Sequence, residues 1–151
     1  RQRVGIAQAL LNEPKIIIFD EPTVGLDPEE RVRFRDLIND LSQDSIVILS
    51  SHIVSDIDSV ADKIVIMKEG RLIKQGTQKE LIDELDNKVF EIVLKKEDLA
   101  SFKEREIVVS TSRKDSGFLV RYLSDHPQNN AVNVLANLED AYLFNTKKEK
   151  I

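Results

Sequence analysis

Two adjacent carboxylates, Asp20 and Glu21, follow an apolar run of strand length, and His52 follows the next such run. In open α/β sheets, ligands collect at the carboxyl ends of the strands. A carboxylate at that edge can hold a magnesium ion, usually through water, and the ion in turn binds phosphate oxygens. A second carboxylate beside it can deprotonate an attacking water. These residue types predict that Asp20 serves the metal and that Glu21 is the general base.

The sequence Asp20-Glu21-Pro22 is a weak signal when it is taken alone. It also fits an ordinary solvated exit from a strand into a loop, with no chemistry attached. The elements around it therefore decide how much weight it carries.

The apolar runs predict the strands that would position these side chains. Residues 16–19 form an unbroken run with β-branched residues, which is typical of a central parallel strand covered on both faces. Residues 45–50 are predicted to form a second strand of this kind and residues 64–67 a third. Glu69-Gly70 is expected to turn the third strand back into residues 71–74 as a hairpin.

Helices are predicted between these strands. The first covers residues 1–11, and its apolar residues share one broad face: Val4, Ile6, Ala7, Leu10 and Leu11. The second begins at Asp27, which can cap it ahead of Pro28. The buried stripe of this second helix is Phe34, Leu37, Ile38 and Leu41. A third helix is expected after His52, and Thr77 to Glu80 match a capping box for a fourth.

The alternation of strands and helices up to residue 86 predicts an α/β domain built on a parallel sheet. Residues 87–151 differ in character and predict a small α+β domain. Its expected strands are 89–94, 107–110, 118–123 and 131–135, with helices at 97–102 and from 137 onward. We therefore predict two domains, 1–86 and 87–151.

Three segments in order closely resemble the ATP-binding cassette (ABC) ATPases. They are RQRVGIAQALL at residues 1–11, IIIFDEPTVGLDP at 16–28, and Ser50-Ser51-His52. The resemblance covers roughly residues 1–82 and implies the C-terminal part of a P-loop NTPase domain. It implies that Asp20 lies on the Mg²⁺ side of a Walker B strand and that Glu21 is the catalytic glutamate. His52 matches the switch histidine, which contacts the γ-phosphate of ATP and steadies that glutamate. Residues 24–27 resemble the D-loop, which gives Asp27 a place at a dimer interface.

Each of these roles has a structural alternative. Asp27 could be only the cap of its helix, or it could be both cap and D-loop residue. His52 could be a residue at the start of a helix with no catalytic part. Its position directly after a buried strand, at the same expected sheet edge as Glu21, favours the functional interpretation.

Two nucleotide-binding motifs are absent from the sequence. None of the five glycines begins the GxxxxGK[ST] pattern of a Walker A loop, whose amides and lysine hold phosphates. There is also no Gly-Gly pair for an ABC signature loop, and the only methionine is Met67. We therefore expect a fragment, the C-terminal part of a longer subunit, that binds ATP poorly and does not hydrolyse it alone.

The C-terminal residues resemble the accessory domain of many ABC exporter ATPases. The resemblance depends on residues 137–143 (NLEDAYL), which are similar to an LED-x-[FY]-L ending. It favours export as the direction of transport. The alternative is that this sequence only begins a terminal helix that packs on the sheet.

Composition limits the partners. The net charge of −5 argues against a nucleic-acid binder, which needs a basic face for the phosphates. No apolar run reaches the roughly 20 residues of a membrane-spanning helix. The resemblance implies ATP and Mg²⁺ as cofactors, a second ATPase subunit and a membrane permease as partners, and a cytoplasmic location on the inner face of the membrane. The remaining alternatives are an ABC ATPase that acts on ribosomes and a chain that only binds or oligomerises.

Overall fold

The computed structural model describes residues 2–147, so position 1 of the predicted first helix lies outside the described residues. The chain divides into two compact units, one ending at Ala61 and the other beginning at Asp62. It is a mixed α/β protein, as the sequence predicted. Among residues 2–147, no helix is both long and apolar enough to cross a lipid bilayer.

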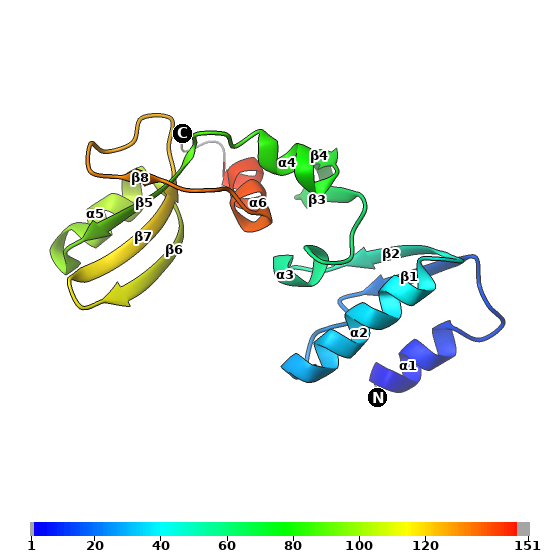
Figure 1. Cartoon of the computed structure of the whole chain (residues 1–151). Coiled ribbons are helices and arrows are strands. Elements are labelled where there is room, and N and C mark those ends of the chain that lie inside the picture. Colours follow the sequence, from blue (N-terminus) through cyan, green and yellow to red (C-terminus); the bar gives the residue numbers. More distant parts are fainter. Residues whose placement is uncertain (1, 148–151) are drawn as a thin grey trace. The chain divides into compact units, whose positions relative to one another are not determined.

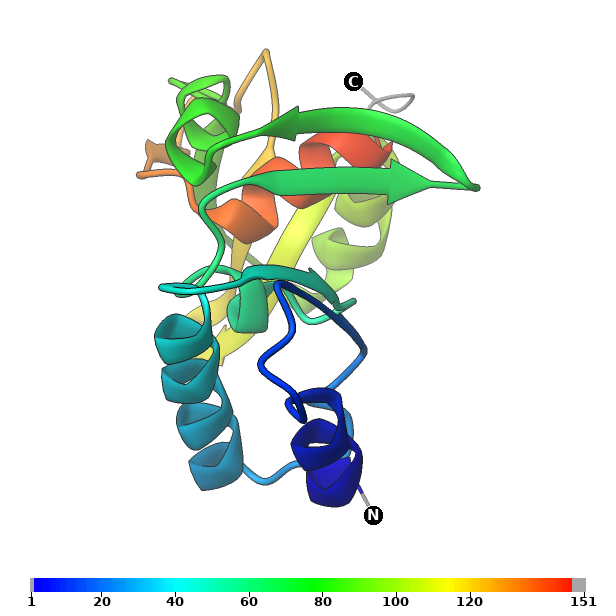
Figure 2. The ribbon, with the colours of Figure 1, turned by 90° about the vertical axis from the view of Figure 1, so that its right-hand side faces the viewer.

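The first unit contains a pair of parallel strands and three helices. Its elements are α1 (Gln2–Ala9), β1 (Ile16–Asp20), α2 (Pro28–Leu41), β2 (Ile46–Ser50) and α3 (Val54–Ile57). Strands β1 and β2 pair in parallel register, from Ile16 opposite Ile46 to Asp20 opposite Ser50. In both ribbon views, α1 and α2 lie on the same side of this strand pair (Figure 1 and Figure 2).

The core of the first unit lies between the strand pair and these helices. Ile17 and Phe19 of β1 alternate inward and pack with Phe34 and Ile38 of α2. The rings of Phe19 and Phe34 meet edge to face, with centroids 5.6 Å apart. The predicted apolar stripe of α2 is thereby confirmed, since Leu37 and Leu41 also contact this cluster.

Two expectations about apolar faces are wrong for the described residues. Strand β1 was predicted to be covered on both faces, but Ile16 is 59% and Ile18 68% exposed, because both helices pack on the other side. The predicted face of α1 is also shifted. Val4 is 70% exposed, whereas Ile6 and Leu10 contact the core, because the helix ends at Ala9 and the chain turns there.

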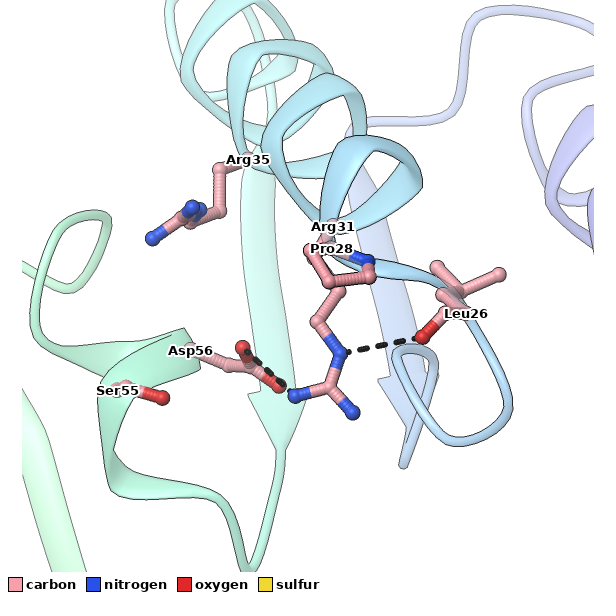
Figure 3. A pocket seen from close by; sticks show the side chains of 6 residues that line it. All are labelled: Leu26, Pro28, Arg31, Arg35, Ser55 and Asp56. Atoms are coloured by element: carbon pink, nitrogen blue, oxygen red, sulfur yellow. Dashed lines mark hydrogen bonds and ion pairs between the residues drawn. The ribbon is translucent and has the colours of Figure 1, made fainter.

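Helix α2 begins with Asp27 as its cap, as the sequence predicted, and the structure adds a capping box with Glu30. The Glu30 backbone N–H donates to Oδ1 of Asp27 at 2.8 Å, and the Asp27 N–H donates to Oε2 of Glu30 at 3.4 Å. One turn into the helix, Arg31 extends across to Asp56 of α3 (Figure 3). These contacts connect α2 to the loop before it and to α3.

The second unit begins with a hairpin and continues into an antiparallel sheet. Its elements are β3 (Ile64–Lys68), β4 (Arg71–Gly76), α4 (Gln78–Asp83), β5 (Val89–Leu94), α5 (Lys96–Arg105), β6 (Ile107–Lys114), β7 (Gly117–Leu123), β8 (Val132–Asn133) and α6 (Leu138–Lys147). The β3–β4 hairpin and the capping box of Thr77 with Glu80 on α4 are both as predicted. Strands β5 to β8 form a sheet in the order β6-β7-β5-β8, with every neighbouring pair antiparallel.

The division into units differs in position from the predicted domain boundary at 86/87. The hairpin and α4 belong to the second unit, because α6 packs against α4, β3 and β4. In the described residues, β3 pairs with β4 and is not a third strand of the β1–β2 sheet.

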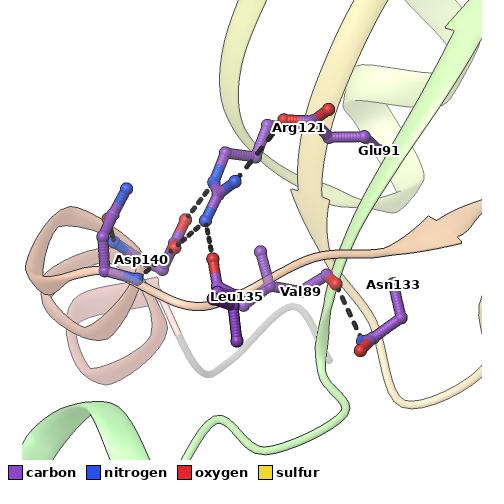
Figure 4. A network of polar contacts seen from close by, with 7 residues as sticks. Val89, Glu91, Arg121, Asn133, Leu135 and Asp140 are labelled. Atoms are coloured by element: carbon purple, nitrogen blue, oxygen red, sulfur yellow. Dashed lines mark hydrogen bonds and ion pairs between the residues drawn. The ribbon is translucent and has the colours of Figure 1, made fainter.

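The second unit has a buried ion pair next to its apolar core. That core includes Phe90, Phe102 and Tyr122, and burial raises the pKa of the Tyr122 hydroxyl. Arg121 of β7 binds Asp140 of α6 through two hydrogen bonds, at 3.0 Å to Oδ1 and 2.6 Å to Oδ2 (Figure 4). The Asp140 carboxylate raises the pKa of the Arg121 guanidinium.

Asp140 belongs to the LED sequence that resembled an exporter motif, and its contacts are structural. Asp140 is 0% exposed, and its carboxylate also accepts a hydrogen bond from the Asn137 backbone N–H at 2.8 Å. Arg121 in addition donates to the carbonyl of Leu135 at 2.5 Å. The Asp140 carboxylate therefore links the start of α6 to β7.

Replacing Asp140 should destabilise the second unit. In Asp140→Asn the Arg121 guanidinium loses its buried counter-charge, and we expect the free energy of unfolding to fall by about 3 kcal/mol. The exposed neighbour Glu139 provides the matched control, since Glu139→Gln should change that free energy by no more than about 0.5 kcal/mol. Denaturant unfolding of both variants measures the difference, and equal stabilities would contradict a structural role for this pair.

Two substitutions of Asp27 distinguish the hydrogen bond that caps α2 from the negative charge of the side chain. Asp27→Ala removes the acceptor for the Glu30 N–H and should lower the free energy of unfolding by about 1 kcal/mol. Asp27→Asn keeps an acceptor without the charge and should remain within a few tenths of a kcal/mol of the parent. Chemical denaturation followed by circular dichroism measures both values. A loss as large in Asp27→Asn as in Asp27→Ala would mean that the charge, and not the cap, stabilises the helix.

Candidate active site

The carboxyl ends of β1 and β2 bring the predicted acidic residues together around Ser50. The strand register places Asp20 directly opposite Ser50. The Ser50 hydroxyl donates a hydrogen bond to Oδ1 of Asp20 at 2.5 Å. The Glu21 backbone N–H donates to the same hydroxyl at 3.2 Å and to the Ser50 carbonyl at 3.1 Å. One serine therefore fixes both the Asp20 side chain and the Glu21 backbone.

Glu21 has a backbone conformation that side-chain-bearing residues rarely adopt. Its φ angle is +47°, in the left-handed region. Such a conformation costs on the order of 1 kcal/mol for a residue with a Cβ, and it persists only where the surroundings fix it. Here the two hydrogen bonds to Ser50 fix it.

The imidazole of His52 lies beside the Glu21 carboxylate. Nδ1 of His52 is 2.7 Å from Oε2 of Glu21, with the Glu21 side chain 36% and the His52 side chain 68% exposed. An ionised carboxylate only accepts hydrogen bonds, so Nδ1 carries the hydrogen in this contact. The other ring nitrogen, Nε2, is then an acceptor in the neutral ring and a donor in the imidazolium.

Asp27 lies at the other end of the loop that begins with Glu21. Two turns shape this loop, one from the Val24 N–H to the Glu21 carbonyl at 3.3 Å and one from the Leu26 N–H to the Thr23 carbonyl at 3.1 Å. The Asp27 carboxylate caps α2 there. The structure thus gathers Asp20, Glu21 and His52 around Ser50 and uses Asp27 to begin the next helix.

The residues present could hold a metal ion only together with other ligands. Within residues 2–147, no group of three or more His, Cys, Asp or Glu side chains is arranged to hold a metal. Asp20 is exposed at the strand end. Mg²⁺ commonly uses one or two carboxylates and takes its remaining ligands from water and substrate phosphates. A single exposed carboxylate with a neighbouring hydroxyl fits that mode of binding.

Two features of this region were not identified from the sequence. In the sequence, Ser50 stands out only as part of a motif, and its place opposite Asp20 depends on the parallel register of β1 with β2. The contact of Arg31 with Asp56 joins side chains 25 positions apart. The charged face of α2 carries several arginines, and nothing in their spacing distinguishes Arg31.

Known proteins similar to this chain are ABC transporter components. The uncharacterized ABC transporter ATP-binding protein YxlF of Bacillus subtilis is 38% identical over 110 residues, which are 73% of this chain and 37% of that protein. YhcH of the same organism, with the same description, is 43% identical over 61% of this chain and 31% of its own length. The energy-coupling factor transporter ATP-binding protein EcfA2 of Ligilactobacillus salivarius is 39% identical over 55% of this chain and 29% of its own length.

A solved structure agrees with these relatives, whereas no protein-family model matches the chain. The structure is that of a bacterial Atm1-family ABC exporter with ATP bound. It has a TM-score of 0.50 and 31% sequence identity, over 55% of this chain and 14% of the exporter chain. The chain therefore spans no more than 37% of the length of any of these proteins. Within that span, the chain is a homologue of the ATP-binding proteins of ABC transporters, as the order of its motifs predicted.

Proposed function

We propose that this chain is the C-terminal part of an ATP-binding subunit that hydrolyses ATP to drive transport through a membrane permease. The contact of His52 with Glu21, beside Asp20 at the ends of two parallel strands, is the observation that carries the proposal. The names of the relatives support ATP binding and transport.

In this mechanism Glu21 accepts a proton from the water that attacks the terminal phosphate. Its backbone is fixed by Ser50 and its carboxylate by Nδ1 of His52, so the base is oriented before the substrate arrives. In its imidazolium form, His52 would donate from Nδ1 to Glu21 and from Nε2 to a γ-phosphate oxygen. Asp20, oriented by the Ser50 hydroxyl, would hold the magnesium ion of the nucleotide. The ion would supply positive charge that neutralises the phosphates.

The proposal extends to the rest of the subunit. Strands in residues 1–86 and further strands of the subunit would together form a parallel P-loop sheet. Residues 87–151 would form an accessory domain of the exporter type. Two such subunits would close over ATP, with Asp27 near their interface, and would bind the permease at the cytoplasmic face of the membrane. The similarity of residues 137–143 to an exporter motif and the exporter structure support export as the direction.

The chain alone is expected to be inactive. Its sequence has no GxxxxGK[ST] loop and no Gly-Gly pair, so no lysine and amide cradle is present to hold the phosphates. Two adjacent carboxylates, Asp20 and Glu21, repel a polyphosphate in the absence of that cradle.

Variants of the complete subunit test the assigned roles. Glu21→Gln keeps the shape of the side chain but removes the base, and we expect steady-state ATP hydrolysis to fall by about 10²–10⁴-fold. His52→Ala should produce a loss of at least tenfold, because the carboxylate and the γ-phosphate both lose a partner. ATP binding, measured by equilibrium dialysis, should persist in both variants, since neither residue belongs to the phosphate cradle.

Asp44→Asn is the matched control, because Asp44 is an exposed carboxylate that follows α2. It should retain the turnover of the parent. If Glu21→Gln hydrolyses ATP as fast as Asp44→Asn, Glu21 is not the base and the proposed mechanism is wrong.

The isolated chain has a second candidate behaviour, self-association. The face of the β1–β2 pair that the helices leave open carries four exposed isoleucines: Ile16, Ile18, Ile46 and Ile48. Such a contiguous apolar face favours association with another protein surface. In the complete subunit, the missing part of the sheet domain would cover it.

Lysine at the centre of this isoleucine face tests its part in association. Ile18→Lys places a charge on the face, and sedimentation velocity should show less self-association of the 151-residue chain than in the parent. Val32→Lys, at an exposed position on α2, is the control and should associate like the parent. Equal association of both variants would exclude the isoleucine face as the contact surface.

A further inference from the structure

Arg31 connects two segments that carry candidate catalytic residues. Its Nε donates a hydrogen bond to the carbonyl of Leu26 at 3.4 Å, at the end of the loop that begins with Glu21. Its terminal nitrogen NH1 lies 3.9 Å from Oδ1 of Asp56, on the helix that follows His52 (Figure 3). The guanidinium therefore contacts both segments at once, with its side chain 31% exposed.

Asp56 requires a cationic partner where it lies. The residue is 3% exposed, and its Oδ2 is buried without a hydrogen-bond partner among residues 2–147. A buried carboxylate without compensation is costly, so an attraction to a fixed cation stabilises it. Asp56 and Arg31 line the same pocket, together with Leu26, Pro28, Arg35 and Ser55. The ion pair with Arg31 supplies a cation to Asp56 and orients the guanidinium toward α3.

The contacts form a closed ring through the candidate active site. From Glu21, the two turns of the loop lead to Leu26, whose carbonyl accepts from Arg31. From Arg31, the ion pair leads to Asp56 in α3, and the Asp56 N–H donates back to the Ile53 carbonyl at 3.1 Å, next to His52. The His52 imidazole then contacts Glu21 and closes the ring. A displacement of Arg31 would therefore be transmitted to both partners of the Glu21–His52 contact.

We infer that Arg31 is a positioning residue, which sets the geometry of the Glu21–His52 pair by joining the 21–27 loop to α3. This inference deepens the proposed function and depends on it. The role requires the guanidinium group, because only its planar fork offers separate donors to a backbone carbonyl and a carboxylate. Lysine at this position would keep the charge opposite Asp56 but would lack the second donor in fixed geometry.

Substitutions of Arg31 in the complete subunit test this inference. In Arg31→Gln the ion pair is lost, and we expect kcat for ATP hydrolysis to fall by roughly tenfold to a hundredfold, with KM for ATP within about twofold of the parent. In Arg31→Lys, which keeps the charge, kcat should fall by a smaller factor. Dividing kcat by the number of ATP-binding sites, from equilibrium dialysis, removes any effect of misfolded protein.

Arg33→Gln is the matched control. Arg33 lies on the same helix but pairs with Glu29 at 2.5 Å on the exposed face. Its kcat and KM should equal those of the parent. If Arg31→Gln and Arg31→Lys both keep the kcat of Arg33→Gln, Arg31 does not position the site.

A double-mutant cycle with His52→Ala separates positioning from general stability. If Arg31 acts through the Glu21–His52 contact, Arg31→Gln should reduce the single-turnover rate of His52→Ala by less than twofold, because the contact is already absent. A full additional tenfold loss in that background would overturn the inference. The proposed function has its own test in Glu21→Gln. A large loss there with a normal Arg31→Gln variant would reject only the positioning role, whereas full activity of Glu21→Gln would reject the proposed function itself.

Discussion

The parallel pairing of β1 with β2 is the constraint on which the candidate site depends. Because the two strands run side by side in register, Asp20 and Ser50 end opposite each other. The residues that follow them, Glu21 and His52, then leave the sheet at the same edge and meet at 2.7 Å. A shift of one residue in this register would turn the alternating side chains to the opposite faces and separate the carboxylates from the serine.

Much of this arrangement was predictable from the sequence because it follows from local rules. The strand ends, the helix caps at Asp27 and Thr77, and the hairpin after Lys68 are each determined by a few neighbouring residues. The meeting of Glu21 with His52 follows from one further rule, that the carboxyl ends of parallel strands share an edge. The contacts of Glu21 with His52 and of Asp20 with Ser50 support the catalytic roles that we propose for these residues.

The features that the sequence did not predict depend on tertiary packing. The unbroken apolar run of β1 predicts a strand covered on both faces, but Ile16 and Ile18 are exposed because α1 and α2 both pack on the opposite face. The inward face of α1 is decided by where the helix ends, and terminal residues are the least certain part of any such prediction. The contact between Arg31 and Asp56 joins two helices through side chains with many equivalent neighbours in the sequence, so only the three-dimensional structure identifies it.

Under the proposed role of Glu21 as the general base, its left-handed backbone places catalysis and stability in opposition at one position. A glycine would occupy φ = +47° without strain, so the local backbone preference favours losing the carboxylate. Replacements of Glu21 that relieve this strain would yield a more stable subunit that does not hydrolyse ATP. Directed evolution for heat resistance alone should therefore favour loss of the Glu21 carboxylate. Selecting for ATP turnover at the same time would retain it.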